Sequence, residues 1–305
     1  MNQPITLWQE LAPKYWPIWL FILIARTLAM LPISWQVQLN KGLASLLGKI
    51  AASRTKTITK NIALAFPEKS QADREQLGKQ NLQHSTMMLF DLINLIWKKP
   101  DTLQKYRSIQ GEEHLKNALA SGQPVLLVGS HMTSFMATLA HLSDVTPMHA
   151  VYRRWDNPVL QKRVVDVAQK RHALSLIHKS EISYMLKKLG SGASVFILPD
   201  QDFGTRRSVF IPFMGIQTAT LTNIPDYANK TNARVLLVSS HRSDDFQTVY
   251  TQITEPLENY PSGDNTLDSK LWSDYLQALV TKYPDQYFWM HKRFKTHPEN
   301  EGPRY

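Results

Sequence analysis

The sequence predicts an α/β fold with a central, mainly parallel mixed sheet flanked by helices, preceded by an N-terminal helical segment. From about residue 124 onward, short apolar runs alternate with helical patterns, which is typical of a layered α/β core. Before residue 110 the patterns are helical. The chain has 305 residues, of which 43% are hydrophobic, so it can bury one large core.

The individual elements follow from the spacing of the apolar residues. Short runs of strand composition predict the sheet, and they are Val125–Val128, His149–Arg153, Leu174–Ile177, Val195–Leu198, Val209–Phe213, Val235–Ser239 and Phe246–Glu255. Longer amphipathic patterns predict the flanking helices, and they are Met132–Leu142, Pro158–Lys170, Ile182–Leu189, Ala219–Asn229 and Thr266–Tyr283. The N-terminal helices are predicted over Trp16–Ile33, Val37–Ala52 and Gln71–Trp97, with Thr57–Pro67 as a connection.

The first of these helical stretches is almost wholly apolar. It covers 18 residues from Trp16 to Ile33, near the lower limit for a membrane span, and Arg26 interrupts it. The alternative is a buried helix of a globular core. Tryptophans flank the stretch, and most nearby basic residues follow it, which favours a membrane-associated segment with the rest of the chain in the cytoplasm. The sequence therefore predicts membrane-associated helices over residues 1–60 and an α/β domain over residues 61–305.

The charge balance of the chain narrows the classes of partner. There are 35 Lys and Arg residues against 25 Asp and Glu residues, a formal charge of +10. Such a balance suggests an acidic partner, which could be nucleic acid, an anionic membrane or an acidic carrier protein. No zinc-finger spacing or aromatic RNA-binding motif accompanies the charge, so we expect no nucleic-acid partner. The absence of cysteine excludes disulfides, thiol catalysis and cysteine-bound metals.

Polar residues follow several predicted strands at their carboxyl ends, where ligands bind in sheets of this kind. His131 follows the strand Val125–Val128 and is predicted as a catalytic acid or base. Arg153 is predicted to bind a phosphate or carboxylate of the substrate. Asp200 and Asp202 are predicted to bind substrate, although turn formation alone would also explain them. No third ligand accompanies the two aspartates, so no metal is expected.

Several longer motifs carry a family resemblance that covers nearly the whole chain. They are Thr59–Pro67, the block around His131, Val151–Arg153 with Asn157-Pro158, Leu198–Gly204, Val209–Gly215, Thr218–Thr220 and Trp289–Lys295. Together they resemble the bacterial lipid A biosynthesis acyltransferases, the late lauroyl/myristoyl acyltransferase family within the lysophospholipid acyltransferase superfamily. The basic part of the last motif, His291–Lys295, follows the aromatic stretch Tyr287–Met290, which suits a membrane surface or lipid phosphates. The alternative is an ordinary charged end of a C-terminal helix.

This resemblance implies a membrane-bound enzyme on the cytoplasmic face of the bacterial inner membrane, active in lipopolysaccharide or lipooligosaccharide biosynthesis. It would move a lauroyl or myristoyl chain from acyl carrier protein to a hydroxyl of a lipid A precursor. His131 would be the general base, and Arg153, Asp200 and Asp202 would hold the substrates. The implied partners are acyl carrier protein, the lipid A precursor and membrane lipids. No cofactor is implied beyond the acyl-carrier co-substrate.

One position departs from the family pattern. In the family motif, four residues separate the histidine from an Asp or Glu. This chain has Met136 at the position of that acid and Ala137 next, and no acid follows His131 before Asp144. Another carboxylate could reach His131 in space, the chain could be an inactive member that binds anionic lipid without turnover, or Ala137 could mark an engineered loss of the acid. Loss of an orienting acid lowers rates about 10⁴-fold in a related arrangement, so a large loss of activity is expected.

Overall fold

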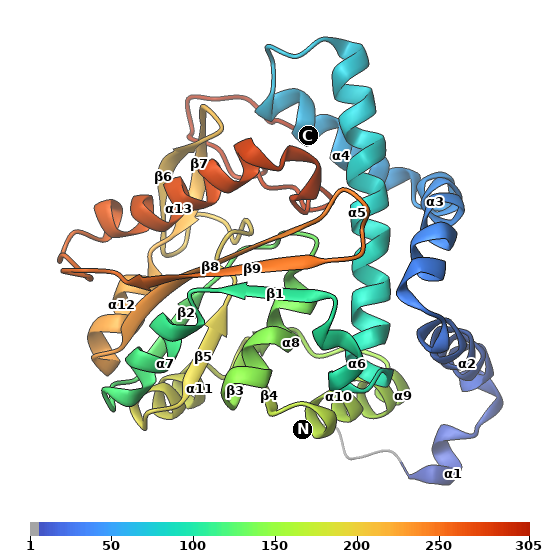
Figure 1. The fold of residues 1–305 in the computed structure, drawn as a ribbon. Coiled ribbons are helices and arrows are strands. Elements are labelled where there is room, and N and C mark those ends of the chain that lie inside the picture. The colour runs from blue at the N-terminus through green and yellow to red at the C-terminus, as the bar shows by residue number, and fades with distance from the viewer. Residues whose placement is uncertain (1–5) are drawn as a thin grey trace.

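The computed structural model describes residues 6–305 and places a seven-stranded sheet at its centre (Figure 1). The first five residues of the predicted 1–60 segment lie outside this range. The strand order is β1-β9-β8-β2-β5-β3-β4. The strands are β1 Arg107–Gln110, β2 Val125–Val128, β3 Met148–Tyr152, β4 Leu174–His178, β5 Ser194–Ile197, β8 Arg234–Arg242 and β9 Val249–Pro256. Only the β8–β9 pair is antiparallel, so the predicted mainly parallel mixed sheet is confirmed.

Helices cover both faces of this sheet. After β1 the helical segments are α7 Glu112–Ala120, α8 Phe135–Val145, α9 Pro158–Leu160, η2 Gln161–Val165, α10 Asp166–Arg171, α11 Ile182–Gly190, α12 Asn223–Thr231, α13 Asn265–Lys282 and η3 Pro284–Gln286. Before them come α1 Leu7–Glu10, η1 Pro13–Tyr15, α2 Trp16–Met30, α3 Ile33–Ile50, α4 Ala52–Ala65, α5 Gln71–Trp97 and α6 Pro100–Gln104. The predicted helix Gln71–Trp97 is confirmed at both ends.

The central strand β2 explains how one apolar run supports two cores. Successive side chains of a strand point to opposite faces of the sheet. Leu126 and Val128 pack among residues of α11, α12 and α13, whereas Val125 and Leu127 pack among residues of α7 and α8. All four residues are buried. A strand with helices on both sides must be apolar throughout, which is the pattern that this run shows.

Two predictions about the middle of the chain are only partly right. Val209–Phe213 is a strand as predicted, β6 (Ser208–Phe213), but it does not join the central sheet and pairs with β7 (Ile216–Leu221) in a separate hairpin. Its two-residue turn, Met214-Gly215, has positive φ at both positions, the geometry that suits a tight hairpin. The predicted helix Ala219–Asn229 therefore loses its first residues to β7, and α12 begins only at Asn223.

Two elements near the N-terminal half also differ from the predictions. Thr57–Pro67, predicted as a connection, belongs mostly to helix α4, which packs against α5 through Ile58 and Ile62. Strand β1 was not predicted. It is a four-residue edge strand of mixed polarity, Arg107–Gln110, which pairs only with β9, so its sequence carries no strand periodicity.

The apolar segment predicted as membrane-associated forms α2, which packs against α5 at the right of Figure 1. One face of α2 is buried through Ile22, Ala25 and Ala29, and its other face is exposed. Within residues 6–305, no helix combines the length and the apolar character required to cross a membrane. The association of this segment with a membrane stays a prediction.

Candidate active site

His131 lies at the carboxyl end of β2, two residues beyond a glycine that the neighbouring strand requires. A Cβ at Gly129 would stand 2.5 Å from the Phe196 ring of β5, so a larger residue would force that buried ring to move. After His131 the chain stays extended: its carbonyl accepts a hydrogen bond from the Phe288 amide at 2.9 Å, and the Thr133 amide donates to the Gln286 carbonyl at 2.7 Å. This pairing delays the helix predicted from Met132, and α8 begins at Phe135.

A buried carboxylate holds His131 from two directions. His131 Nδ1 lies 2.7 Å from Asp200 Oδ1, and the His131 backbone amide donates to Asp200 Oδ2 at 2.9 Å. Asp200 is fully buried, and it follows β5, the strand next to β2. Burial raises the pKa of the Asp200 carboxyl, but the charge and hydrogen bonds of His131 outweigh burial, so this pKa is lowered. The carboxylate is therefore ionised.

This pairing sets the chemistry that His131 can perform. An ionised acceptor at Nδ1 places the imidazole proton there, so Nε2 carries the free lone pair. Among residues 6–305, Nε2 has no hydrogen-bond partner, and 18% of the His131 side chain is exposed. The Phe135 ring meets the imidazole edge-on at 5.4 Å. His131 can therefore take a proton from a bound group, while Asp200 stabilises the imidazolium that results.

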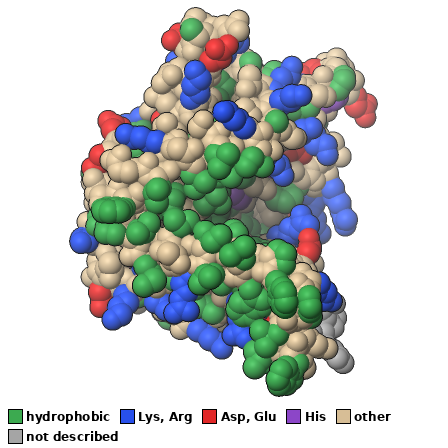
Figure 2. All heavy atoms as spheres, turned by 90° about the vertical axis from the view of Figure 1, so that its right-hand side faces the viewer, with side chains coloured by type: hydrophobic (Ala, Val, Ile, Leu, Met, Phe, Trp, Pro, Cys, Tyr) green, Lys and Arg blue, Asp and Glu red, His purple; other side chains and the backbone are tan. Residues whose placement is uncertain are grey.

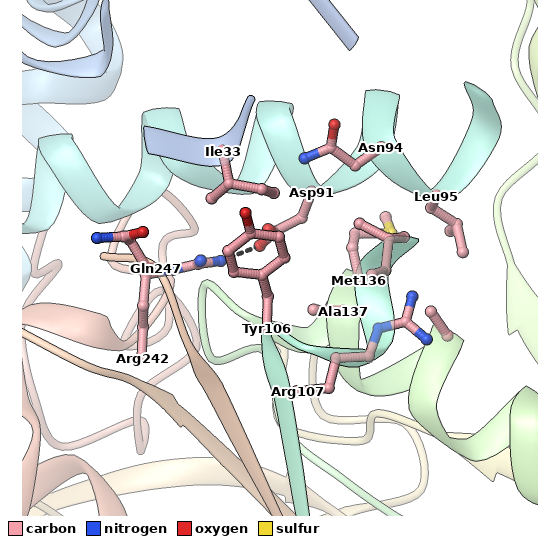
Figure 3. Close-up of a pocket in the computed structure, with 12 residues that line it drawn as sticks. Ile33, Asp91, Asn94, Leu95, Tyr106, Arg107, Met136, Ala137, Arg242 and Gln247 are labelled. Carbon is pink, nitrogen blue, oxygen red and sulfur yellow. Dashed lines mark hydrogen bonds and ion pairs between the residues drawn. The ribbon is translucent and has the colours of Figure 1, made fainter. Parts of the chain in front are cut away.

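Met136 and Ala137, the positions where the family motif leads one to expect an acid, line a small cavity together with α5 (Figure 3). The cavity has a volume of about 30 Å³, room for one or two water molecules. Asp91 of α5 faces it and forms a buried ion pair with Arg242 of β8. The acid that contacts His131 is instead Asp200, which follows β5.

Replacing Asp91 with alanine is expected to lower the free energy of unfolding by about 3–5 kcal/mol, because the buried Arg242 would lose its ion-pair partner. Denaturant unfolding measures this change. A matched control is Asp274→Ala, which removes an acid from the exposed pair with Lys270 and is expected to cost under about 1 kcal/mol. Equal losses in the two variants would contradict the importance of the buried pair.

Asp202, predicted to bind substrate, has its carboxylate engaged within the protein. Its Oδ1 accepts hydrogen bonds from the Gly204 amide at 2.9 Å and the Thr296 hydroxyl at 2.8 Å, and Oδ2 accepts from the Thr296 amide at 2.7 Å. Asp200 bonds to His131 through both oxygens. The turn Asp200–Gly204 therefore connects the end of β5 to His131 on one side and to the C-terminal segment on the other.

Arg153 follows β3 at the same edge of the sheet, but the structure does not bring it into contact with His131. Its side chain is 72% exposed, and within residues 6–305 its ion pair is with Asp156, at 3.7 Å. Strand β5 lies between β3 and β2. The guanidinium is free of buried contacts, so it can meet a ligand that approaches from solvent.

The C-terminal motif Trp289–Lys295, whose basic part suggests a membrane surface in the sequence, is only partly exposed, at Lys292 and Lys295. Trp289, Arg293 and Phe294 are all buried. Arg293 donates to the Ala219 carbonyl at 2.8 Å and lies over the Phe213 ring, and its charge also lowers the pKa of Asp200. The residues next to Arg293 in the sequence do not distinguish a buried arginine from an exposed one. His291, in the same motif, was not predicted as a site residue and lies at the turn that holds His131.

No group of three or more side chains suited to hold a metal ion occurs in the part of the chain that the structure describes.

Comparison with known proteins shows the family of this chain. The family model for bacterial lipid A biosynthesis acyltransferases matches residues 4–296. The lipid A biosynthesis lauroyltransferase of Escherichia coli K12 is 30% identical over 298 residues, 97% of this chain and 96% of that protein. The palmitoleoyltransferase and the myristoyltransferase of the same strain are 27% and 23% identical, with 97% and 95% of this chain and 96% and 90% of those proteins covered. The chain belongs to the bacterial lipid A biosynthesis acyltransferase family.

Proposed function

We propose that this protein transfers a fatty acyl chain from acyl carrier protein to a hydroxyl of a lipid A precursor, with His131 as the general base and Asp200 as its orienting acid. The observation that carries the proposal is the pair itself, in which Asp200 holds Nδ1 at 2.7 Å and leaves Nε2 free. Membership of the family supplies the reaction class. In this proposal Asp200 orients His131 in place of the acid that the family motif has at position 136, so this chain is proposed to be active.

The reaction uses His131 twice. Nε2 accepts the proton of the acceptor hydroxyl as its oxygen attacks the thioester carbonyl carbon, forming the new C–O bond. When the tetrahedral intermediate collapses, the C–S bond breaks and the imidazolium returns the proton to the leaving sulfur. Asp200 stabilises the imidazolium between these steps and keeps the ring in place. Products are the O-acyl ester and the free carrier thiol.

Positive charge supports the proposed substrates. The formal charge of +10 favours an acidic carrier protein and an anionic lipid. Arg153 and Arg154 are exposed after β3, at the edge of the sheet where His131 also lies. An exposed guanidinium can bind a phosphate or carboxylate with two parallel hydrogen bonds. We assign Arg153 to such contacts with the approaching substrates.

Exposed apolar side chains over α1–α3 support a membrane-bound location. Figure 2 shows hydrophobic side chains gathered on this side of the molecule, with Lys and Arg side chains around them. The large exposed ones on this N-terminal face are Leu7, Trp8, Leu11, Trp16, Leu20, Phe21, Leu23, Ile24, Met30, Trp35, Leu39, Leu46 and Ile50. A contiguous patch of this kind is typical of an interaction with another protein or a membrane. Exposed Lys41 and Lys49 beside it suit anionic lipid, and we assign the face to the cytoplasmic side of the inner membrane.

Replacing Trp16, Phe21 and Ile24 together with serine is expected to weaken binding to anionic phospholipid vesicles at least about 10-fold, because each residue would bury apolar surface in the bilayer. Co-sedimentation with vesicles measures the change. The matched control is Leu267→Ser on α13, whose side chain is as exposed but lies outside the N-terminal face. Binding that does not distinguish the triple variant from the control would remove this face as the membrane contact.

The proposed function is tested with a purified lipid A precursor and with acyl carrier protein that bears a radiolabelled acyl chain. We expect wild-type protein to form an ester from at least one of the lauroyl, myristoyl and palmitoleoyl donors, and no product from an acceptor whose free hydroxyls are blocked. Vesicle binding without transfer from any donor would instead identify a catalytically silent member of the family.

A further inference from the structure

A second histidine is attached to the turn that holds His131. Asp200 binds His131, and two residues later the Asp202 backbone amide donates a hydrogen bond to His291 Nε2 at 3.0 Å. One five-residue turn therefore contacts both imidazoles. This arrangement joins the C-terminal motif to the proposed catalytic centre.

The hydrogen bond to Asp202 determines which nitrogen of His291 carries the proton. A backbone amide can only donate, so Nε2 must be the acceptor, and the neutral ring carries its proton on Nδ1. Burial lowers the pKa of His291, and the charge of His131 lowers it further, against the opposing influence of Asp200 and Asp202. Arg293 also lowers it. His291 is thus a neutral ring with a donor at Nδ1, and within residues 6–305 no acceptor binds that donor.

The position of His291 is held by its own backbone. Its carbonyl accepts a hydrogen bond from the buried side chain of Asn61 at 2.7 Å, and its amide donates to the Phe288 carbonyl at 3.3 Å. Phe288 in turn donates its amide to the His131 carbonyl at 2.9 Å. A short chain of hydrogen bonds therefore also connects the backbones of the two histidines through Phe288.

We propose that His291 is a second catalytic residue of the proposed acyl transfer, whose Nδ1–H donates a hydrogen bond to the thioester carbonyl oxygen. As the acceptor hydroxyl attacks, the carbonyl π electrons move onto that oxygen, and a fixed donor stabilises the negative charge. The hydroxyl proton goes to His131, and His291 gains and loses none. A neutral donor suits this place, because a second cation beside His131 would make protonation of His131 harder. This inference rests on the proposed function.

Two substitutions separate this role from a structural one. His291→Gln keeps an acceptor near the position of Nε2 for the Asp202 amide but removes the Nδ1 donor, whereas His291→Asn places an amide donor near Nδ1 and loses that acceptor. If Nδ1–H stabilises the carbonyl oxygen, the glutamine variant is expected to lose about 10²- to 10³-fold in kcat with KM little changed. The asparagine variant is expected to retain much more of the wild-type kcat than the glutamine variant. The control is His297→Gln, a histidine of the same segment whose Nδ1 lies 2.9 Å from the Pro298 carbonyl.

The outcomes distinguish this inference from the proposed function. Kinetics are measured with the radiolabelled donor, and thermal unfolding is followed for each variant. Wild-type kcat in the glutamine variant would overturn the role of His291 and leave the acyl transfer intact. So would a pattern in which glutamine preserves both stability and kcat and asparagine loses both, since it marks a structural contact. Absence of transfer by the wild-type protein would refute the proposed function itself.

Discussion

Replacing His131 with glutamine is expected to lower kcat for acyl transfer by about 10⁴-fold or more, because the variant has no group that can accept the hydroxyl proton. Glutamine is similar in size and retains a polar side chain beside Asp200, so the fold is expected to persist. Initial rates of transfer of a radiolabelled acyl chain from acyl carrier protein measure the effect, and thermal unfolding verifies that the variant is folded.

The matched control for this variant is His178→Gln. His178 ends β4 at the same edge of the sheet, and its Nδ1 lies 2.6 Å from the Ser180 hydroxyl rather than a carboxylate. We expect this control to retain wild-type kcat. A His131 variant with wild-type kcat would show that the base is another residue.

Replacing Asp200 with asparagine is expected to lower kcat by about 10⁴-fold with a much smaller change in KM. The asparagine amide would present a donor to His131 and favour the wrong tautomer, so the ring could no longer accept a proton at Nε2. The substitution is nearly isosteric, and the same kinetic assay measures it. The outcome distinguishes an orienting acid from the substrate-binding role that the sequence suggests for Asp200.

Two further variants test whether position 136 or 137 could serve instead. Met136 and Ala137 line the cavity beside Asp91, so we expect that neither Met136→Glu nor Ala137→Glu raises the activity of the wild-type chain. Neither is expected to restore activity to Asp200→Asn. Activity that appears only in Ala137→Glu would contradict the role of Asp200 and indicate that an acid has been removed from that position.

The place of His131 after a strand could be predicted because it depends on local patterns. The apolar run Val125–Val128 ends in His131, and parallel strands collect ligands at their carboxyl ends. The partner of His131 could not be predicted in this way. Asp200 lies 69 residues away, and it reaches His131 only because β5 pairs directly with β2, although β3 and β4 come between them in sequence.

The C-terminal motif is a second case in which the sequence pattern alone does not predict the contacts of the residues. Trp289–Lys295 reads as an aromatic and basic surface segment, yet Arg293 is 1% exposed and binds the Ala219 carbonyl of β7. Burial of an arginine depends on acceptors supplied by distant elements. Sequence spacing contains no information about those contacts, so neither the burial of Arg293 nor the hydrogen bond of His291 to Asp202 could be predicted.

The sequence by itself determines the α/β class, the strand β2, the long helix α5 and the histidine at the strand end, because hydrophobic periodicity and strand ends are properties of neighbouring residues. Tertiary structure alone decides that Asp200 pairs with His131, that His291 contacts the same turn and which face of α2 stays exposed. These depend on the order of strands in the sheet and on the packing of the helices against α5. Both are contacts between residues far apart in the chain.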